Sequence, residues 1–154
     1  MKECKIFISL YNMARLKIME VIGVEILFKG RRIDNKEWIK GGYYKCKDGR
    51  EYIVGECRSF YEVDSESVSI YTGIDINEEQ VFLGDVAHYT MFEDGEIVLD
   101  GHFKVIFKDG SFYTEDFQGG TQYLVDDTGE GRENEKVELV GHITDKEWVD
   151  IRDV

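Results

Sequence analysis

Residues 69–86 read Ser69-Ile-Tyr-Thr-Gly-Ile-Asp-Ile-Asn-Glu-Glu-Gln-Val-Phe-Leu-Gly-Asp-Val86, and this mid-chain stretch divides the protein into two parts. It is the segment least like a regular alternation of strand residues, and its aspartates Asp75 and Asp85 each adjoin a turn that contains glycine. Strand-forming sequence lies on both sides of it, and the sign of the charge changes across it. We therefore expect residues 69–86 to form the joint at which two systems of strands meet.

The charge of the chain is asymmetric about this joint. Residues 1–70 hold 13 Lys and Arg against 11 Asp and Glu, whereas residues 71–154 hold 6 against 21, and the net charge is −13. An acidic second half repels a phosphate backbone, which argues against nucleic acid as a partner. Residues 29–50, the basic patch, hold eight Lys and Arg against three Asp and Glu. Either this patch meets the acidic surface of a second copy, or it is the solvated surface of a hairpin whose edges lysines protect.

Asp-Gly pairs occur at residues 48–49, 94–95, 100–101 and 109–110, and the chain has no proline. Asp-Gly favours the type I′ turn, whose twist matches that of the flanking strands. The clearest hairpin covers residues 102–114, where Phe103, Val105 and Phe107 share one face of a strand. We therefore predict a mainly β (β-rich α+β) fold in which antiparallel hairpins form two coiled sheets. The second sheet, from Asp85 to Ile143, is expected to be either an open coiled sheet or a small SH3-like barrel.

The two ends of the chain carry weaker signals. Apolar residues recur every three positions within residues 12–20, which indicates a short helix in a poorly defined leader, residues 1–20. Residues 26–46 read as a hairpin that turns at residues 34–36. Residues 144–147 fit a capping box ahead of a short C-terminal helix that contains Trp148 and Ile151. Residues 21–154 are thus expected to form one domain with subregions 21–70 and 71–154.

The composition is that of a globular protein of the cytoplasm. Hydrophobic residues make up 42% of the 154 residues, and no apolar run approaches the roughly 20 residues of a membrane span. The N-terminus lacks the apolar core and the cleavage site of a signal peptide. Cys4, Cys46 and Cys57 form an odd set without Cys-x-x-Cys spacing, so they indicate neither a disulfide framework nor a zinc site. The expected location is therefore the reducing cytoplasm.

The sequence offers few residues for chemistry. His88, His102 and His142 are too far apart along the chain for a local zinc motif, and no glycine-rich loop carries the Lys-Ser/Thr of a phosphate-binding loop. We predict no catalytic residue, metal or cofactor. Asp75 and Asp85 would form the site of a carboxylate-dependent hydrolase only if they faced each other across a cleft. The alternative is that Asp75 accepts backbone N–H groups of its own turn and Asp85 caps the strand that begins at Val86.

Four short motifs in order carry a family resemblance. They are Phe28-Lys-Gly-Arg-Arg-Ile-Asp-Asn-Lys-Glu-Trp38, Tyr71-Thr-Gly-Ile-Asp75, Gly84-Asp85-Val86 and Leu139-Val-Gly-His-Ile143. Together they resemble the YopX family of phage and prophage proteins over residues 24–145. The chain departs from the family where an Asn-Gly turn is replaced by Asn77-Glu78 in a shorter connection, and where Glu-Gly-Asp is replaced by Leu83-Gly84-Asp85. The resemblance implies a small, mainly β phage protein without an established activity.

The function expected from these observations is a non-enzymatic, phage-encoded interaction protein that associates with itself or with a host or phage protein, away from membranes. One alternative is an acidic decoy whose second half mimics nucleic acid and inhibits a host DNA-binding enzyme. Within that half, the acidic segment 126–135 is expected to be a mobile loop. The hydrolase is a second alternative. The candidate ligand or partner surface comprises Arg31, Arg32, Asp34, Trp38, Tyr71, Thr72, Asp75 and Asp85.

Overall fold

The computed structural model of the chain describes residues 26–123 and 134–149. The strands are β1 Phe28–Arg31, β2 Trp38–Lys45, β3 Glu51–Val54, β4 Phe60–Val63, β5 Ser69–Ile76, β6 Glu79–Phe82, β7 Asp85–Glu93, β8 Glu96–Lys108, β9 Ser111–Asp116, β10 Thr121–Tyr123 and β11 Glu135–His142. The short helices are η1 Glu56–Arg58, η2 Ser65–Ser67 and α2 Lys146–Val149. The predicted leader, Ile151 and residues 126–133 of the acidic segment lie outside the described residues.

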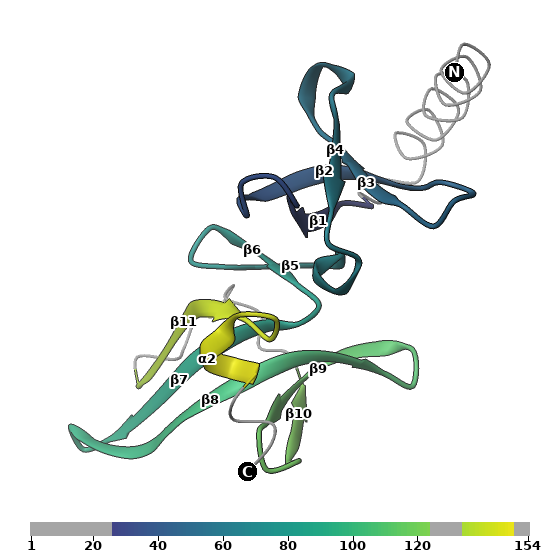
Figure 1. Cartoon of the computed structure of the whole chain (residues 1–154). Coiled ribbons are helices and arrows are strands. Elements are labelled where there is room, and N and C mark those ends of the chain that lie inside the picture. Colours follow the sequence, from purple (N-terminus) through teal and green to yellow (C-terminus); the bar gives the residue numbers. More distant parts are fainter. Residues whose placement is uncertain (1–25, 124–133, 150–154) are drawn as a thin grey trace.

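The described strands form two antiparallel sheets, as the sequence predicts. The first sheet has the order β4-β3-β2-β1-β5-β6, and the second has the order β10-β9-β8-β7-β11. The chain passes from one sheet to the other between β6 and β7, inside the stretch expected to be the joint (Figure 1). The end strands of the second sheet, β10 and β11, are connected through residues 124–133, so its closure into an SH3-like barrel stays a prediction.

The first sheet curls because β2 changes its partner along its length. Residues 38–41 pair with β1, and residues 42–45 pair with β3. At the far side of the curl, β4 meets the end of β1, where an isolated bridge joins Arg32 to Val63 and the Ile33 N–H donates to the Glu62 carbonyl at 3.1 Å. The predicted hairpin over residues 26–46 is confirmed as β1 and β2.

The prediction of a turn at each Asp-Gly pair is confirmed at three places and wrong at one. In the β7–β8 and β8–β9 hairpins both turn residues are left-handed, with φ of 51° at Asp94 and 50° at Asp109, as a type I′ turn requires. Asp48-Gly49 does turn the chain between β2 and β3, but only Gly49 is left-handed there. Residues 100–101 form no turn, because they lie inside β8 and pair with Thr90 and Tyr89 of β7.

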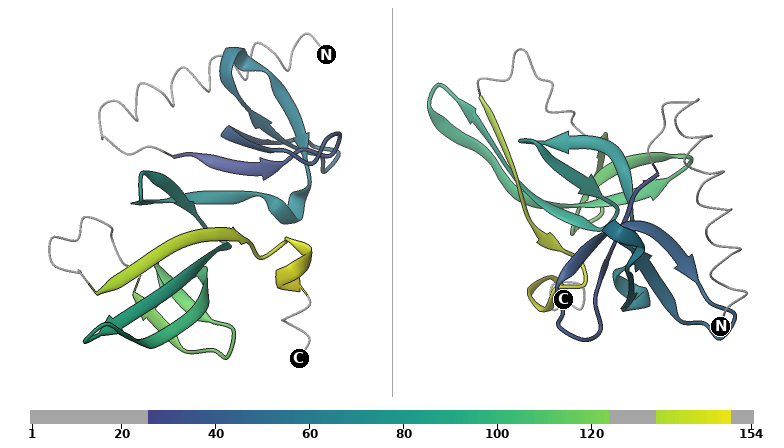
Figure 2. Two further views of the ribbon diagram at one scale, coloured as in Figure 1. Left: turned by 90° about the vertical axis from the view of Figure 1, so that its left-hand side faces the viewer. Right: turned by 90° about the horizontal axis from the view of Figure 1, so that it is seen from above.

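A small apolar core lies between the two sheets. Ile76 and Val81 of the first sheet are buried against Val105 of the second, and half-buried side chains complete the cluster: Phe112, Val137 and Leu139. Figures 1 and 2 show β5 and β6 between the rest of the first sheet and the second sheet. Burial of this cluster holds β5 and β6 on the second sheet, and the polar groups described below lie at the same junction.

The predicted C-terminal helix is confirmed as the single turn α2, whose Trp148 is buried. The sequence predicts that Thr144 caps this helix with its hydroxyl group. The hydroxyl lies 2.8 Å from Nδ1 of His142. None of the helices in residues 26–123 and 134–149 has the length and hydrophobicity needed to cross a bilayer.

The β5–β6 turn holds two residues in an unfavourable conformation. Asn77 has a φ of 51° and Glu78 a φ of 65°, so both are left-handed although neither is glycine. Asparagine tolerates this conformation, whereas a glutamate does not gain any local hydrogen bond from it. The Asn77 side chain also donates to the Val137 carbonyl at 2.8 Å, which ties the turn to β11.

Replacing Glu78 with glycine is therefore expected to raise the free energy of unfolding by about 0.5–1 kcal/mol, because glycine adopts a positive φ without steric cost. Urea denaturation followed by circular dichroism measures the change. Glu79→Gly is the matched control, since it removes the same charge one residue later, inside β6, and should destabilise the protein. Equal effects of the two substitutions would contradict the interpretation.

Candidate functional site

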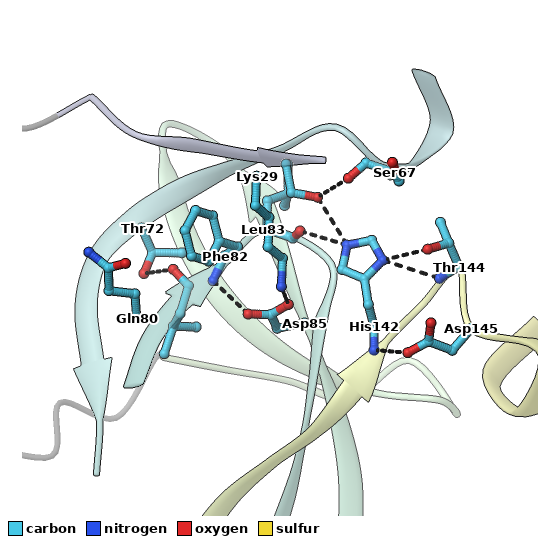
Figure 3. A network of polar contacts seen from close by, with 12 residues as sticks. Lys29, Ser67, Thr72, Gln80, Phe82, Leu83, Asp85, His142, Thr144 and Asp145 are labelled. Atoms are coloured by element: carbon cyan, nitrogen blue, oxygen red, sulfur yellow. Dashed lines mark hydrogen bonds and ion pairs between the residues drawn. The ribbon is translucent and has the colours of Figure 1, made fainter. Parts of the chain in front are cut away.

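A cluster of polar side chains is buried where the two sheets meet, and we call it the junction cluster (Figure 3). Its first part is Asp85, which begins β7 and is 2% exposed. One carboxylate oxygen forms an ion pair with Lys29 of β1, and the other accepts the Phe82 backbone N–H at 2.8 Å. Burial raises the pKa of Asp85, against the opposing effects of Lys29 and the Phe82 N–H.

The second part of the cluster is His142, the last residue of β11, which is 2% exposed. Its Nε2 lies 3.2 Å from the Leu83 carbonyl oxygen and 2.9 Å from the Ser69 hydroxyl. Its Nδ1 accepts the Thr144 backbone N–H at 3.3 Å. Because a carbonyl can only accept and an N–H can only donate, these partners fit a neutral imidazole that carries its proton on Nε2.

The surroundings of His142 oppose its protonation. Burial, followed by repulsion from Lys29, lowers the pKa of His142 to about 4. Gly84 makes room for the ring, since it has a φ of 83° and a Cβ there would lie 2.6 Å from Nε2. At neutral pH the imidazole is therefore an uncharged link between β11, β5 and the β6–β7 turn.

The third part of the cluster joins β1 to the turn after β11. Arg31 forms an ion pair with one oxygen of Asp145, and the other oxygen accepts the His142 backbone N–H at 2.8 Å. Partial burial of Asp145 works in the opposite direction, but Arg31 and the His142 N–H together lower the pKa of this carboxyl group. The Arg31 backbone N–H also donates to the Ser67 hydroxyl at 2.7 Å.

Trp38 packs against the cluster. Lys29 Nζ and Arg31 Cζ each lie 4.7 Å from the centroid of the Trp38 ring, and the ring meets His142 edge to face at 4.9 Å. Cations over an aromatic face are stabilised by the ring quadrupole, most strongly where water is excluded. The half-buried indole thus holds in place the side chains of Lys29 and Arg31, which extend from the first sheet to carboxylates of the second half of the chain.

The structure brings three of the predicted site residues together and separates the others. Arg31, Trp38 and Asp85 belong to the junction cluster. Arg32 and Asp34 instead form an ion pair within the β1–β2 turn, where the Arg32 guanidinium lowers the pKa of Asp34.

The basic patch is largely neutralised inside the chain. Lys29 and Arg31 pair with carboxylates of the second half, and the other cations that have carboxylate partners are Arg32, Lys45 and Arg50. The charge asymmetry of the sequence is therefore used in part to hold the two halves of one molecule together.

Tyr71, Thr72 and Asp75 lie on β5, apart from the buried cluster. The exposed Asp75 accepts the Tyr71 hydroxyl at 2.7 Å. The Thr72 hydroxyl donates to the Val81 carbonyl at 2.9 Å, where the β5–β6 register is irregular. Asp75 is thus exposed and bonded to Tyr71, whereas Asp85 is buried and paired with Lys29.

The contact between Ser69 and His142 has the length of a nucleophile–base pair but not its other properties. Both residues are buried, with Ser69 4% exposed, and Nδ1 of His142 faces Thr144 where a catalytic dyad would have an orienting carboxylate. The proton on Nε2 also leaves no free lone pair to take the serine proton. Among the described residues, no group of three or more His, Cys, Asp or Glu side chains is arranged to hold a metal ion.

Sequence reasoning missed Lys29, Ser69, His142 and Asp145 as members of the site. In the sequence, Lys29 belongs to the basic patch, and His142 has the residue type of a metal ligand or of the base in a Cys-His pair. The one signal that pointed to His142 was its place in the motif Leu139–Ile143 on which the family resemblance rests.

The fold and the junction cluster define a small two-sheet β protein whose halves are joined by the ion pair of Lys29 with the buried Asp85, by the half-buried pair of Arg31 with Asp145, and by a neutral histidine. Comparisons with models of protein families, with curated proteins and with solved structures find no match to the chain.

Proposed function

We propose that this protein is a non-enzymatic interaction module, encoded by a phage or prophage, that associates with itself in the cytoplasm of the bacterial host. The observation that carries the proposal is the end of the β7–β8 hairpin. Ile97, Val98 and Leu99 are consecutive in β8 and are 60%, 46% and 38% exposed. Contiguous exposed apolar surface is typical of protein–protein contact sites.

The hairpin end projects from the body of the molecule (Figure 1). All residues from Glu93 to Asp100 are exposed, so the side chains on both faces of this part of β8 reach solvent. A strand at the surface of a monomer normally buries every second side chain. An element that exposes apolar residues on both faces is suited to being covered by another protein surface.

The junction cluster supports the non-enzymatic part of the proposal. Its charged groups are paired with each other, and His142 and Asp85 are each only 2% exposed. Such groups hold the two sheets in register and offer no reactive atom to a substrate. The phage origin rests on the resemblance of residues 24–145 to the YopX family.

Size-exclusion chromatography with light scattering tests the proposal. At micromolar concentration the purified chain should give a mass that is a multiple of 17.9 kDa and that decreases on dilution. A mass of 17.9 kDa at every concentration, in both low and high salt, would rule out self-association.

A further inference from the structure

We infer that two copies associate through β8 itself: residues 96–102 of one copy lie antiparallel to residues 96–102 of the other, about a two-fold axis near Leu99. The inference rests on the proposed self-association and specifies its contact surface. It also predicts which residues of the two copies face each other.

Among the described strands, residues 96–102 of β8 have a neighbour on one side only. Residues 96–104 pair with β7, but β9 pairs with β8 only from Phe103 to Lys108. Within the described part of the chain, the other edge of residues 96–102 is open. An open edge with apolar side chains is the feature of a sheet that most readily accepts another strand.

The open edge of residues 96–102 is complementary to the same edge of a second copy. It begins after the turn at Gly95 and ends where β9 begins to pair, so its midpoint is Leu99. Antiparallel pairing about that midpoint places Leu99 opposite Leu99 and Glu96 opposite His102. Glu96 and His102 are both exposed, and a carboxylate opposite an imidazole is favourable, whereas pairing about Val98 would place Glu96 opposite Asp100.

Pairing of β8 with β8 is expected to stop at two copies. In a two-fold contact the same edge is used by both partners, so pairing consumes the open edge of each. The acidic side chains of Glu93, Asp94 and Glu96 resist the addition of further strands at this end of the hairpin. The expected product is a dimer with a continuous sheet and no free β8 edge.

Disulfide trapping tests the register. In a chain that carries Cys4→Ser, Cys46→Ser and Cys57→Ser, Leu99→Cys should form a covalent dimer when oxidised glutathione is added, because directly opposed residues of antiparallel strands lie within disulfide range. Ile33→Cys in the same chain is the matched control, since Ile33 is 46% exposed but lies in the β1–β2 turn, and it should remain largely uncrosslinked. Equal crosslinking of the two variants would overturn the inference.

A second variant separates failure of this inference from failure of the proposed function. Ile97→Thr combined with Leu99→Thr keeps residues that favour strands but removes the apolar contact, and should raise the dissociation constant of the dimer at least about tenfold. Ile33→Thr should leave it unchanged. If the parent chain is monomeric, the proposed function fails. If the parent associates but the double variant associates equally well, the proposed function stands and β8 is not the contact surface.

Discussion

Replacing Lys29 with methionine is expected to lower the free energy of unfolding by about 3–5 kcal/mol, the cost typical of breaking a buried ion pair by removing one partner. The Lys29 side chain is 13% exposed, and that of its partner Asp85 is 3% exposed. Methionine keeps most of the aliphatic stem beside Trp38 and Phe82 but leaves the Asp85 carboxylate with the Phe82 N–H alone. Urea denaturation at neutral pH measures the loss.

Two further variants show whether the loss comes from the unpaired charge. Combining Lys29→Met with Asp85→Asn removes the buried charge but keeps an oxygen for the Phe82 N–H, so at least half of the lost stability should return. Lys136→Met breaks an exposed ion pair with Glu138 and should cost less than about 1 kcal/mol. If Lys29→Met and Lys136→Met lowered the free energy of unfolding by similar amounts, burial of Asp85 would not be the reason for the effect of Lys29→Met.

Acid is expected to destabilise the protein through His142. Because the pKa of His142 is lowered to about 4 from 6.5, the unfolded chain binds the proton more readily than the folded one. The stability that comes from the neutral imidazole is fully present above pH 6.5 and is lost progressively as the pH falls toward 4. At 1.36 kcal/mol for each pKa unit, the total loss is roughly 3 kcal/mol.

The comparison that isolates this effect is between the parent chain and His142→Gln. Glutamine cannot titrate, so the difference in unfolding free energy between the two proteins should be constant between pH 7 and 8 and should shrink by roughly 2–3 kcal/mol between pH 6.5 and 4. Urea denaturation at each pH supplies the values. A difference that does not change with pH would mean that the folded and unfolded chains bind a proton at His142 equally well.

Local signals predicted most of the fold. Asp94-Gly95 and Asp109-Gly110 are each followed and preceded by strand formers, and the type I′ preference of such pairs is a property of the two residues themselves. Asp100-Gly101 carries the same signal but lies within β8, where Asp100 accepts hydrogen bonds from His88 and Thr90 of the neighbouring strand. Pairing with β7 outweighs the turn preference there, and a sequence does not display that pairing.

The junction cluster was beyond local reasoning for the same reason. Lys29 is 56 residues from Asp85, and Ser69 is 73 residues from His142. Charge counts by segment revealed opposite signs in the two halves but not which side chains meet. Arg31, Trp38 and Asp85 lie in short distinctive motifs and can be recognised in the sequence, whereas their partners can be identified only from the placement of the strands.

The division into two sheets has a consequence for how the chain folds. Most strand pairs join neighbours in sequence, such as β2 with β3 and β8 with β9, whereas the junction cluster joins residues that are far apart. Contacts between distant residues carry the larger loop-closure entropy and tend to form after local ones. We therefore expect the hairpins to form early and the docking of the two sheets to limit the folding rate, so that changes at Lys29 or His142 lower the rate of folding.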